Sequence, residues 1–296
     1  MDKFRISINT GLKLVVWGIP LGLTLRLIQM NLFFDFDTGF YTGPGAALAW
    51  LGLLLPAAMA GAGAWCFYKN AGAFMPRDRG MARGPGIFAG FSGGVLLVMG
   101  LYMLRDHLSR AATGFAEFET AVNPGLHLSL CVLCLVLGAL HCFLAVCLCA
   151  GRDPFKKAPL LYLPGVAWGM AQLVAVYVFY ARSSSTVENL YSLISSGLML
   201  LALFYLSAAL SGAGEPRALM RLYIFGGLSA VLTIPYDLSN IVLALRGTTY
   251  FGELPAIYAL GRLSVCMFLL SFILSVYRTG VDKSLDGAVT AKGEGA

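Results

Sequence analysis

Three charged residues, Arg26, Asp237 and Arg262, lie inside stretches that are otherwise apolar. A charge inside a bilayer is costly, so such residues usually face the interior of a helix bundle and mark binding or ion pathways. Asp237 lies about seven residues before the end of its predicted helix and Arg262 about seven after the start of the next, so each is roughly 10 Å below the same membrane boundary. A short loop joins these helices, which should therefore be antiparallel neighbours. The spacing predicts an ion pair between Asp237 and Arg262.

Other polar residues are expected at a similar depth. Tyr236 and Asn240 lie near Asp237 on one predicted helix, and Tyr258 lies four residues before Arg262 on the next. Residues three or four apart share a helix face. The sequence therefore predicts a ligand-binding or intramembrane polar cluster, composed of Arg26, Gln172, Tyr236, Asp237, Asn240, Tyr258 and Arg262.

The charges of this predicted cluster favour an anionic or zwitterionic ligand. Asp237 is the only carboxylate inside the predicted spans, so the two arginines leave a surplus of positive charge. A planar guanidinium matches the geometry of a carboxylate or phosphate. Asp35 or Asp37 could instead neutralise Arg26, which would remove this argument. A lone intramembrane carboxylate also argues against a catalytic pair of carboxylates. The sequence therefore favours a protein without enzymatic activity, and we predict no catalytic residue.

The apolar stretch 125–149 holds five of the seven cysteines and two of the three histidines. The spacing of His127 and His141 resembles that of the haem ligands in transmembrane b-type cytochromes, but two bis-His haems need four histidines. The tetrapeptide CVLC, from Cys131 to Cys134, resembles that of DsbB-type thiol oxidoreductases, which also need a cysteine pair outside the membrane. Thiols and imidazoles suit copper or zinc as well. We expect these cysteines to act as small apolar packing residues, with no metal or cofactor.

The composition explains why these residues must be positioned by membrane helices. The chain has 296 residues, of which 58% are hydrophobic and 12% charged, with a mean hydropathy of +0.76. Soluble domains contain about 25% charged residues. A spanning helix needs about 20 mostly apolar residues. The sequence thus predicts an all-α integral membrane protein, a bundle of eight spans in four consecutive hairpins, at residues 11–31, 45–68, 86–104, 125–149, 159–181, 190–211, 221–244 and 255–277.

Basic residues predict the orientation of this bundle. With the N-terminus inside, the outer segments hold Arg105, Arg110, Arg182 and Arg246, whereas the inner segments hold most of the 21 lysines and arginines. Cytoplasmic loops carry such an excess. We therefore expect a multi-pass protein of the cell membrane with both termini in the cytoplasm. Residues 1–277 should form one transmembrane domain, followed by a short, disordered cytoplasmic tail at 278–296.

Three function classes follow. The first is binding or translocation of a small anionic or zwitterionic solute at the polar cluster, although a transporter should also offer polar groups in its inner half, which here is nearly apolar. The second is a receptor or accessory subunit that acts through a cytoplasmic or membrane partner protein. The third is a membrane thiol or metal redox protein built on residues 125–149. The basic charge is explained by orientation, and nucleic acid is not an expected partner.

Overall fold

The computed structural model of this chain describes residues 6–38, 40–75, 84–113, 123–152, 154–180, 186–214, 216–247 and 256–286. Within these ranges eight helices are long and apolar enough to cross a membrane, and they pack as one bundle. The predicted multi-pass helical fold is thereby confirmed. The helices are α1 Ile8–Leu32, α2 Gly45–Lys69, α3 Gly84–Thr113, α4 Pro124–Cys149, α5 Leu163–Tyr180, α6 Thr186–Ser211, α7 Arg217–Leu245 and α8 Ala256–Thr279.

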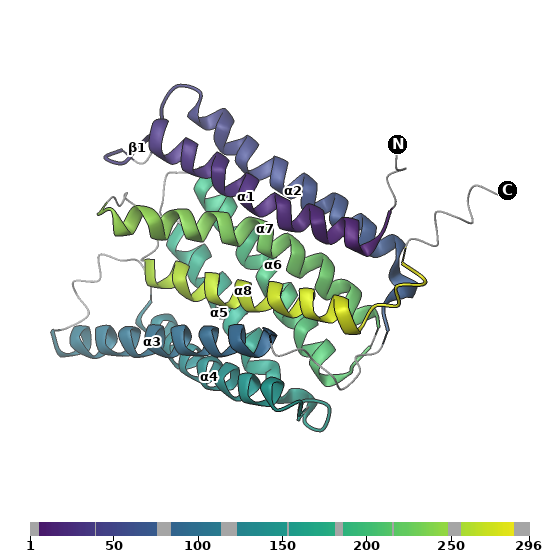
Figure 1. The fold of residues 1–296 in the computed structure, drawn as a ribbon. Helices are drawn as coiled ribbons and strands as arrows, with labels where there is room; N and C mark the ends of the chain where they lie inside the picture. The colour runs from purple at the N-terminus through teal and green to yellow at the C-terminus, as the bar shows by residue number, and fades with distance from the viewer. Residues whose placement is uncertain are drawn as a thin grey trace.

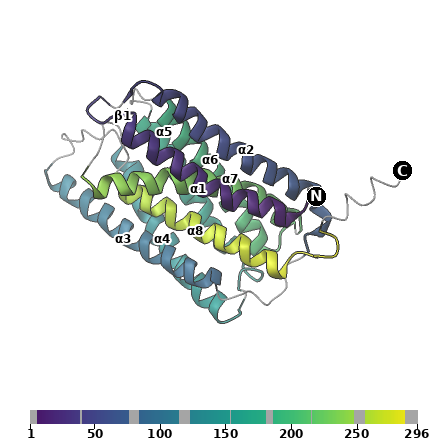
Figure 2. The same ribbon diagram turned by 45° about the horizontal axis from the view of Figure 1, so that its top comes forward.

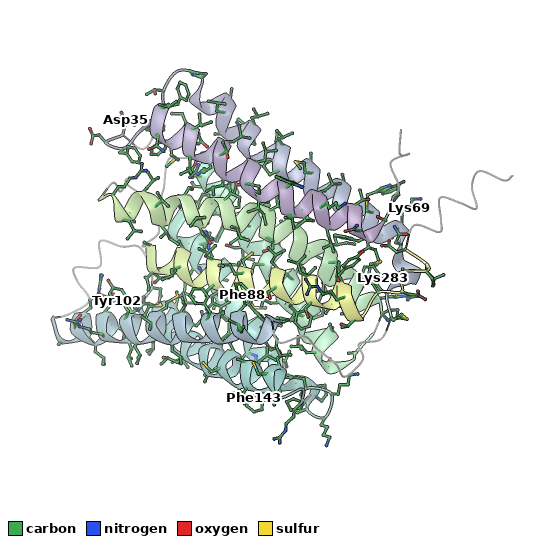
Figure 3. All side chains as sticks on the ribbon, viewed as in Figure 1. Asp35, Lys69, Phe88, Tyr102, Phe143 and Lys283 are labelled. Carbon is green, nitrogen blue, oxygen red and sulfur yellow. The ribbon has the colours of Figure 1, made fainter. Side chains whose placement is uncertain are left out.

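Short elements complete the described chain. Strands β1 (Phe34–Asp35) and β2 (Phe40–Tyr41) pair as an antiparallel hairpin between α1 and α2. Two short 3₁₀ helices, η1 (Ala71–Ala73) and η3 (Pro159–Tyr162), follow α2 and precede α5. We call the end of the bundle where this hairpin lies the hairpin end, and the end where α1 begins and α8 finishes the terminus end. Asp35 marks the first, and Lys69 and Lys283 mark the second (Figure 3).

Helix α7 is the centre of the bundle. It packs against α1, α2, α6 and α8, while α8 also packs against α3. The pair α1 and α2 lies on one side of α7 and α8, and the pair α3 and α4 on the other (Figures 1 and 2). The most apolar windows of α7 and α8 are 67% and 72% buried, against 33% for α1 and α2. The two most enclosed helices are therefore those that carry Asp237 and Arg262, away from lipid.

Residues 278–286 belong to the stretch for which a disordered tail was expected. In the structure, α8 continues to Thr279, and Phe74 and Val281 then form an antiparallel bridge beside η1. Asp286 Oδ1 accepts a hydrogen bond of 2.6 Å from the backbone N–H of Ile8, at the start of α1. This segment therefore ties the end of α8 to the start of α1 and to the residues that follow α2. The remainder of the tail, 287–296, lies outside the described residues.

Candidate functional site

The predicted ion pair between Asp237 and Arg262 is present, deep between α7 and α8. The guanidinium meets both carboxylate oxygens: Nη2 pairs with Oδ1, and Nε donates to Oδ2 at 3.1 Å. Arg262 Nη1 donates to the hydroxyls of Ser192 and Ser196 on α6, each at 3.0 Å. Asp237 is 0% exposed and Arg262 1%. Burial of two charges is tolerated here because the pair is bidentate and the arginine Nη1 is bonded to the two serines.

Arg26 on α1 has a counter-charge that the sequence analysis missed. Its two terminal nitrogens bind the two carboxylate oxygens of Glu188, in the first turn of α6, and both side chains are buried. The Tyr41 hydroxyl, on β2, donates to the same carboxylate. Burial, and then the negative charge of Glu188, raise the pKa of the Tyr41 phenol, which keeps it protonated as a donor.

Glu188 overturns two expectations about charge. The predicted sixth span began at residue 190, but α6 begins at Thr186, so Asp237 is not the only carboxylate inside a span. The pairing of Arg26 with Glu188 also removes the predicted surplus of positive charge. Asp35 is engaged elsewhere: its carboxylate accepts hydrogen bonds from the Asp37 N–H and the Thr38 hydroxyl, within the hairpin turn. The described core thus pairs two arginines with two carboxylates.

The ring of Tyr236 connects the two ion pairs. The guanidinium carbon of Arg26 lies 5.0 Å from the ring centroid, and that of Arg262 lies 5.7 Å from it. Both distances fall within the range of cation–π attraction. Tyr191 of α6 stacks on the same ring, with centroids 5.0 Å apart. We call this assembly the paired-arginine cluster, composed of Arg26, Tyr41, Glu188, Tyr191, Ser192, Ser196, Tyr236, Asp237 and Arg262.

The other predicted site residues lie around this cluster or apart from it. Asn240 is buried on α7, three residues beyond Asp237 and so on the same face. Gln172 is buried on α5, and neither its amide nitrogen nor its amide oxygen has a hydrogen-bond partner in the described protein. Tyr258 is buried on α8 but has Cys134, Asp106 and Arg110 as electrostatic neighbours, so it lies toward α3 and α4.

Several buried polar atoms in or beside the cluster have no hydrogen-bond partner in the described protein. They are Arg26 Nε, Gln29 Nε2, Tyr191 Oη and Asn240 Oδ1. Farther along α7, toward the terminus end, the hydroxyls of Thr233 and Ser229 are also buried, and both face the Cys266 thiol of α8. More than nine in ten buried polar groups in proteins are bonded, and each one that is not costs about 1–3 kcal/mol. In the described protein, such atoms are concentrated around the two buried ion pairs.

Helix α4 uses its cysteines and histidines in a different way. Cys131 Sγ donates to the Gly100 carbonyl oxygen of α3 at 3.2 Å, while Cys134 Sγ accepts from Trp168 Nε1 of α5 at 3.2 Å. His141 lies between the hydroxyls of Ser92 and Tyr162, at 2.9 Å and 2.7 Å. Nearer the hairpin end, the ring of His127 stacks on that of His107, with centroids 5.8 Å apart. These side chains therefore connect α4 to the helices beside it.

The cysteines of α4 do not converge on a common centre. All seven cysteines of the chain are free thiols, and Cys131 and Cys134 turn toward different helices. Within the described ranges, no group of three or more His, Cys, Asp or Glu side chains is arranged to hold a metal ion. The arrangement in this part of the chain is that of packing contacts.

Comparison of the chain with family models, with curated proteins and with solved structures finds no match in any of the three.

Proposed function

We propose that this multi-pass membrane protein binds a small zwitterionic solute at the paired-arginine cluster. The observation that carries the proposal is the pair of buried Arg–carboxylate contacts joined through Tyr236, with unpartnered polar atoms beside them. A protein that needed only a structural clamp would gain nothing from leaving those atoms unbonded. Buried ionisable groups inside a membrane most often serve binding or transport.

Charge balance favours a zwitterion over a simple anion. The cluster holds two positive and two negative groups, so a lone anion would leave a net negative charge in a low-dielectric site. A solute with a carboxylate and an ammonium can exchange with a protein pair at no net change in charge. Its carboxylate would take the place of Glu188 at Arg26, and its ammonium would bind the released Glu188 carboxylate.

The Arg26–Glu188 pair is the natural point of exchange. Glu188 lies in the first turn of α6, and Tyr41, which holds its carboxylate, belongs to the β1–β2 hairpin at the end of the bundle. Displacement of the Tyr41 side chain would open the cluster toward that end. The Asp237–Arg262 pair is held by two serines of α6 and would act as the fixed inner wall.

The proposal extends to translocation, in which the bound solute would pass from the cluster toward the terminus end. Thr233 and Ser229 continue the polar face of α7 from the cluster toward the terminus end, and both are fully buried. Beyond them the Tyr223 hydroxyl is bonded to the Ile273 carbonyl at 2.7 Å, which closes that path. Passage of a solute would therefore require α7 and α8 to separate near Tyr223, whereas binding requires movement only at the hairpin end.

The second candidate function is an accessory or receptor subunit that acts through partner proteins. The observation that favours it is the mutual neutralisation of all four charges within the cluster, which a structural clamp would also show. A ligand-binding experiment separates the two functions, because a clamp has no affinity for solutes.

The experiment is thermal unfolding of the purified chain in detergent with a panel of solutes. The panel contains α-amino acids and betaines as zwitterions, with matched simple carboxylates, amines and phosphates. We expect zwitterions alone to raise the melting temperature, since a ligand at 100 times its Kd stabilises by about 2.7 kcal/mol. Failure of every solute to shift the transition would favour the accessory subunit, and a shift by simple carboxylates or phosphates alone would refute the zwitterion.

The matched variants preserve the charge balance. Arg26→Gln combined with Glu188→Gln removes one ion pair without leaving a buried charge alone, and should abolish the ligand shift. The control is Arg246→Gln at the same end of the bundle, where the exposed guanidinium donates to Asn31 Oδ1 at 3.0 Å. It should leave the ligand shift intact. An equal loss in both variants would show that the shift does not come from the cluster.

We also propose that the hairpin end faces the outside of the cell, as the distribution of lysine and arginine predicts. On a background without native cysteines, Thr38→Cys should react with a membrane-impermeant thiol reagent added to intact cells. Lys283→Cys should react only after the membrane is opened. The reverse pattern would place the cluster on the cytoplasmic side.

A further inference from the structure

A groove of about 520 Å³ runs along the bundle between α1 and α8, with α7 at its floor and the start of α3 at its edge. Most of its lining is aliphatic or aromatic, including Ile19, Phe88, Ile234, Met267 and Leu274. Phe88 lies where α3 meets α8 (Figure 3). The groove lies within helices long enough to span the membrane, so its apolar walls are at the depth of lipid acyl chains.

A second groove, of about 460 Å³, continues the first at the terminus end. Leu274 and Arg278 line both grooves, so the two adjoin each other. The second groove adds two further cations, Lys13 from α1 and Lys283 from the segment after α8. Among the described residues that line the two grooves there is no carboxylate. We call the combined feature the α1–α8 trough.

The three cations of the trough are available for a ligand. Lys13, Arg278 and Lys283 are exposed, and no carboxylate of the described ranges pairs with them within 4.0 Å. The nearby carboxylates are otherwise engaged. Asp286 accepts from the Ile8 N–H at 2.6 Å, and Asp282 accepts from the Ser284 N–H at 2.9 Å.

We propose that the α1–α8 trough binds one anionic phospholipid from the leaflet that surrounds the terminus end. Its headgroup phosphate binds Lys13, Arg278 and Lys283, and one acyl chain follows the apolar groove toward Ile234. Basic pockets between helices at the membrane surface recognise anionic headgroups in this way. Trp17 and Tyr277 line the same end of the trough, and Trp17 is 68% exposed. Aromatic side chains of this kind belong to the interface between headgroups and acyl chains.

The shape of the trough selects a lipid over a soluble phosphate. Lys13 lies five residues after the start of α1, roughly 8 Å below the end of the helix, from where a lysine reaches the interface along its apolar stem. A free phosphate would satisfy the cations but leave the adjoining apolar groove uncovered. A phospholipid satisfies both parts at once. The three cations lie at the opposite end of the bundle from the paired-arginine cluster, so binding of the headgroup does not depend on the proposed solute.

The test is native mass spectrometry of the full chain in detergent, titrated with phosphatidylglycerol or with phosphatidylcholine of the same acyl chains. With three cations at the headgroup, we expect phosphatidylglycerol to bind tighter by on the order of tenfold or more. Combined substitution of the three cations by glutamine (Lys13→Gln, Arg278→Gln, Lys283→Gln) should remove that preference. The matched control neutralises three other basic residues of the terminus end (Lys69→Gln, Arg217→Gln, Arg221→Gln) and should preserve it.

Two further experiments test the acyl-chain groove and the preference for a lipid over a soluble phosphate. Ser271→Phe fills the apolar groove and should weaken phosphatidylglycerol and phosphatidylcholine alike, because Ser271 lines the path of the acyl chain. Glycerol phosphate and inorganic phosphate should not displace the bound lipid at millimolar concentration. If the triple variant folds poorly, Lys283→Gln alone, in the segment after α8, should still reduce the preference. Equal affinity for the two lipids, an equal loss in the control variant, or displacement by inorganic phosphate would overturn the proposal.

Discussion

The paired-arginine cluster and helix α4 both place polar, chemically reactive side chains in apolar surroundings. In the cluster, side chains from α1, α6, α7 and α8 and from the β1–β2 hairpin converge on two ion pairs and one shared ring. In α4, by contrast, Cys131 bonds to α3, Cys134 bonds to α5, and His141 lies between Ser92 of α3 and Tyr162 of η3. Cys131, Cys134 and His141 of α4 each have a hydrogen-bond partner, whereas the cluster retains polar atoms without one.

This difference shows what residue type alone does not reveal. A stripe of cysteine and histidine along one helix looks like a site in sequence, but successive positions point to different neighbours. A binding site requires side chains from several helices at one depth. In this chain, depth within the membrane was the stronger signal, and it belonged to the arginines and carboxylates. If the comparison holds, breaking a contact in the cluster should cost more than breaking one in α4.

The largest effect should come from Asp237→Asn. The substitution leaves Arg262 buried with no counter-charge, and removal of one partner of a buried pair costs about 3–5 kcal/mol of unfolding free energy. The measurement is unfolding by sodium dodecyl sulfate in mixed micelles. Exchange of the charges, Asp237→Arg with Arg262→Asp, should recover part of the loss. If Asp237→Asn leaves the unfolding free energy unchanged, the pair does not contribute to stability and the cluster resembles α4.

Glu188→Gln should follow, at about 3 kcal/mol, the lower end of the range for a broken buried pair. The effect is smaller because Glu188 lies in the first turn of α6, close to the hairpin end. The double variant Arg26→Gln with Glu188→Gln should be more stable than Glu188→Gln alone, since it leaves no unpaired charge. The control is Asp37→Asn in the exposed hairpin turn, expected within about 0.5 kcal/mol of the parent. If Asp37→Asn lowers the unfolding free energy more than Glu188→Gln does, the counter-charge of Arg26 would come from the hairpin rather than from Glu188.

The Asp237–Arg262 pair could be predicted because its geometry depends on few quantities. The two residues occupy consecutive antiparallel helices, and the count from the connecting loop fixes their depths. Glu188 was missed because the polar residues before Leu190 moved the predicted start of the span inward. A signal for the earlier start was present: Ser185, Thr186, Val187 and Glu188 follow the capping-box pattern, a hydroxyl residue with glutamate three positions later.

The positions of Tyr258 and Gln172 illustrate the other limit of sequence reasoning. Depth can be counted along a helix, but the direction in which a side chain faces depends on how each helix is rotated in the bundle. Gly261 lies against Met99 of α3, where an added Cβ would be 2.5 Å from the Met99 sulfur. That close approach turns part of α8 toward α3, and Tyr258 faces the same way while the longer Arg262 side chain reaches α6 and α7. No pattern in a single sequence specifies this rotation.

A smaller effect is expected at His141 on α4. His141→Leu removes two hydrogen bonds and leaves the Tyr162 hydroxyl buried without its partner, while Ser92 retains a contact of 3.5 Å with the Ser264 hydroxyl. The loss should be about 1–3 kcal/mol, the usual cost of one unsatisfied buried group. Tyr162→Phe should cost less, because it removes only one of the bonds. The same micelle unfolding measures both, and a loss above that of Asp237→Asn would reverse the comparison.

The smallest effect should come from Cys131→Ala. The thiol is fully buried and donates one bond to the Gly100 carbonyl, so its removal leaves a small cavity worth about 1 kcal/mol. Cys134→Ala should cost slightly more, because the indole N–H of Trp168 loses its acceptor. Neither variant should alter a solute-induced shift in melting temperature, because neither thiol contacts the paired-arginine cluster. The decisive control is alkylation of the parent after treatment with a quinone: both thiols should remain free, since they bond to different helices. A disulfide between Cys131 and Cys134 would show that α4 can rearrange for redox chemistry, and the contrast between the two regions would then fail.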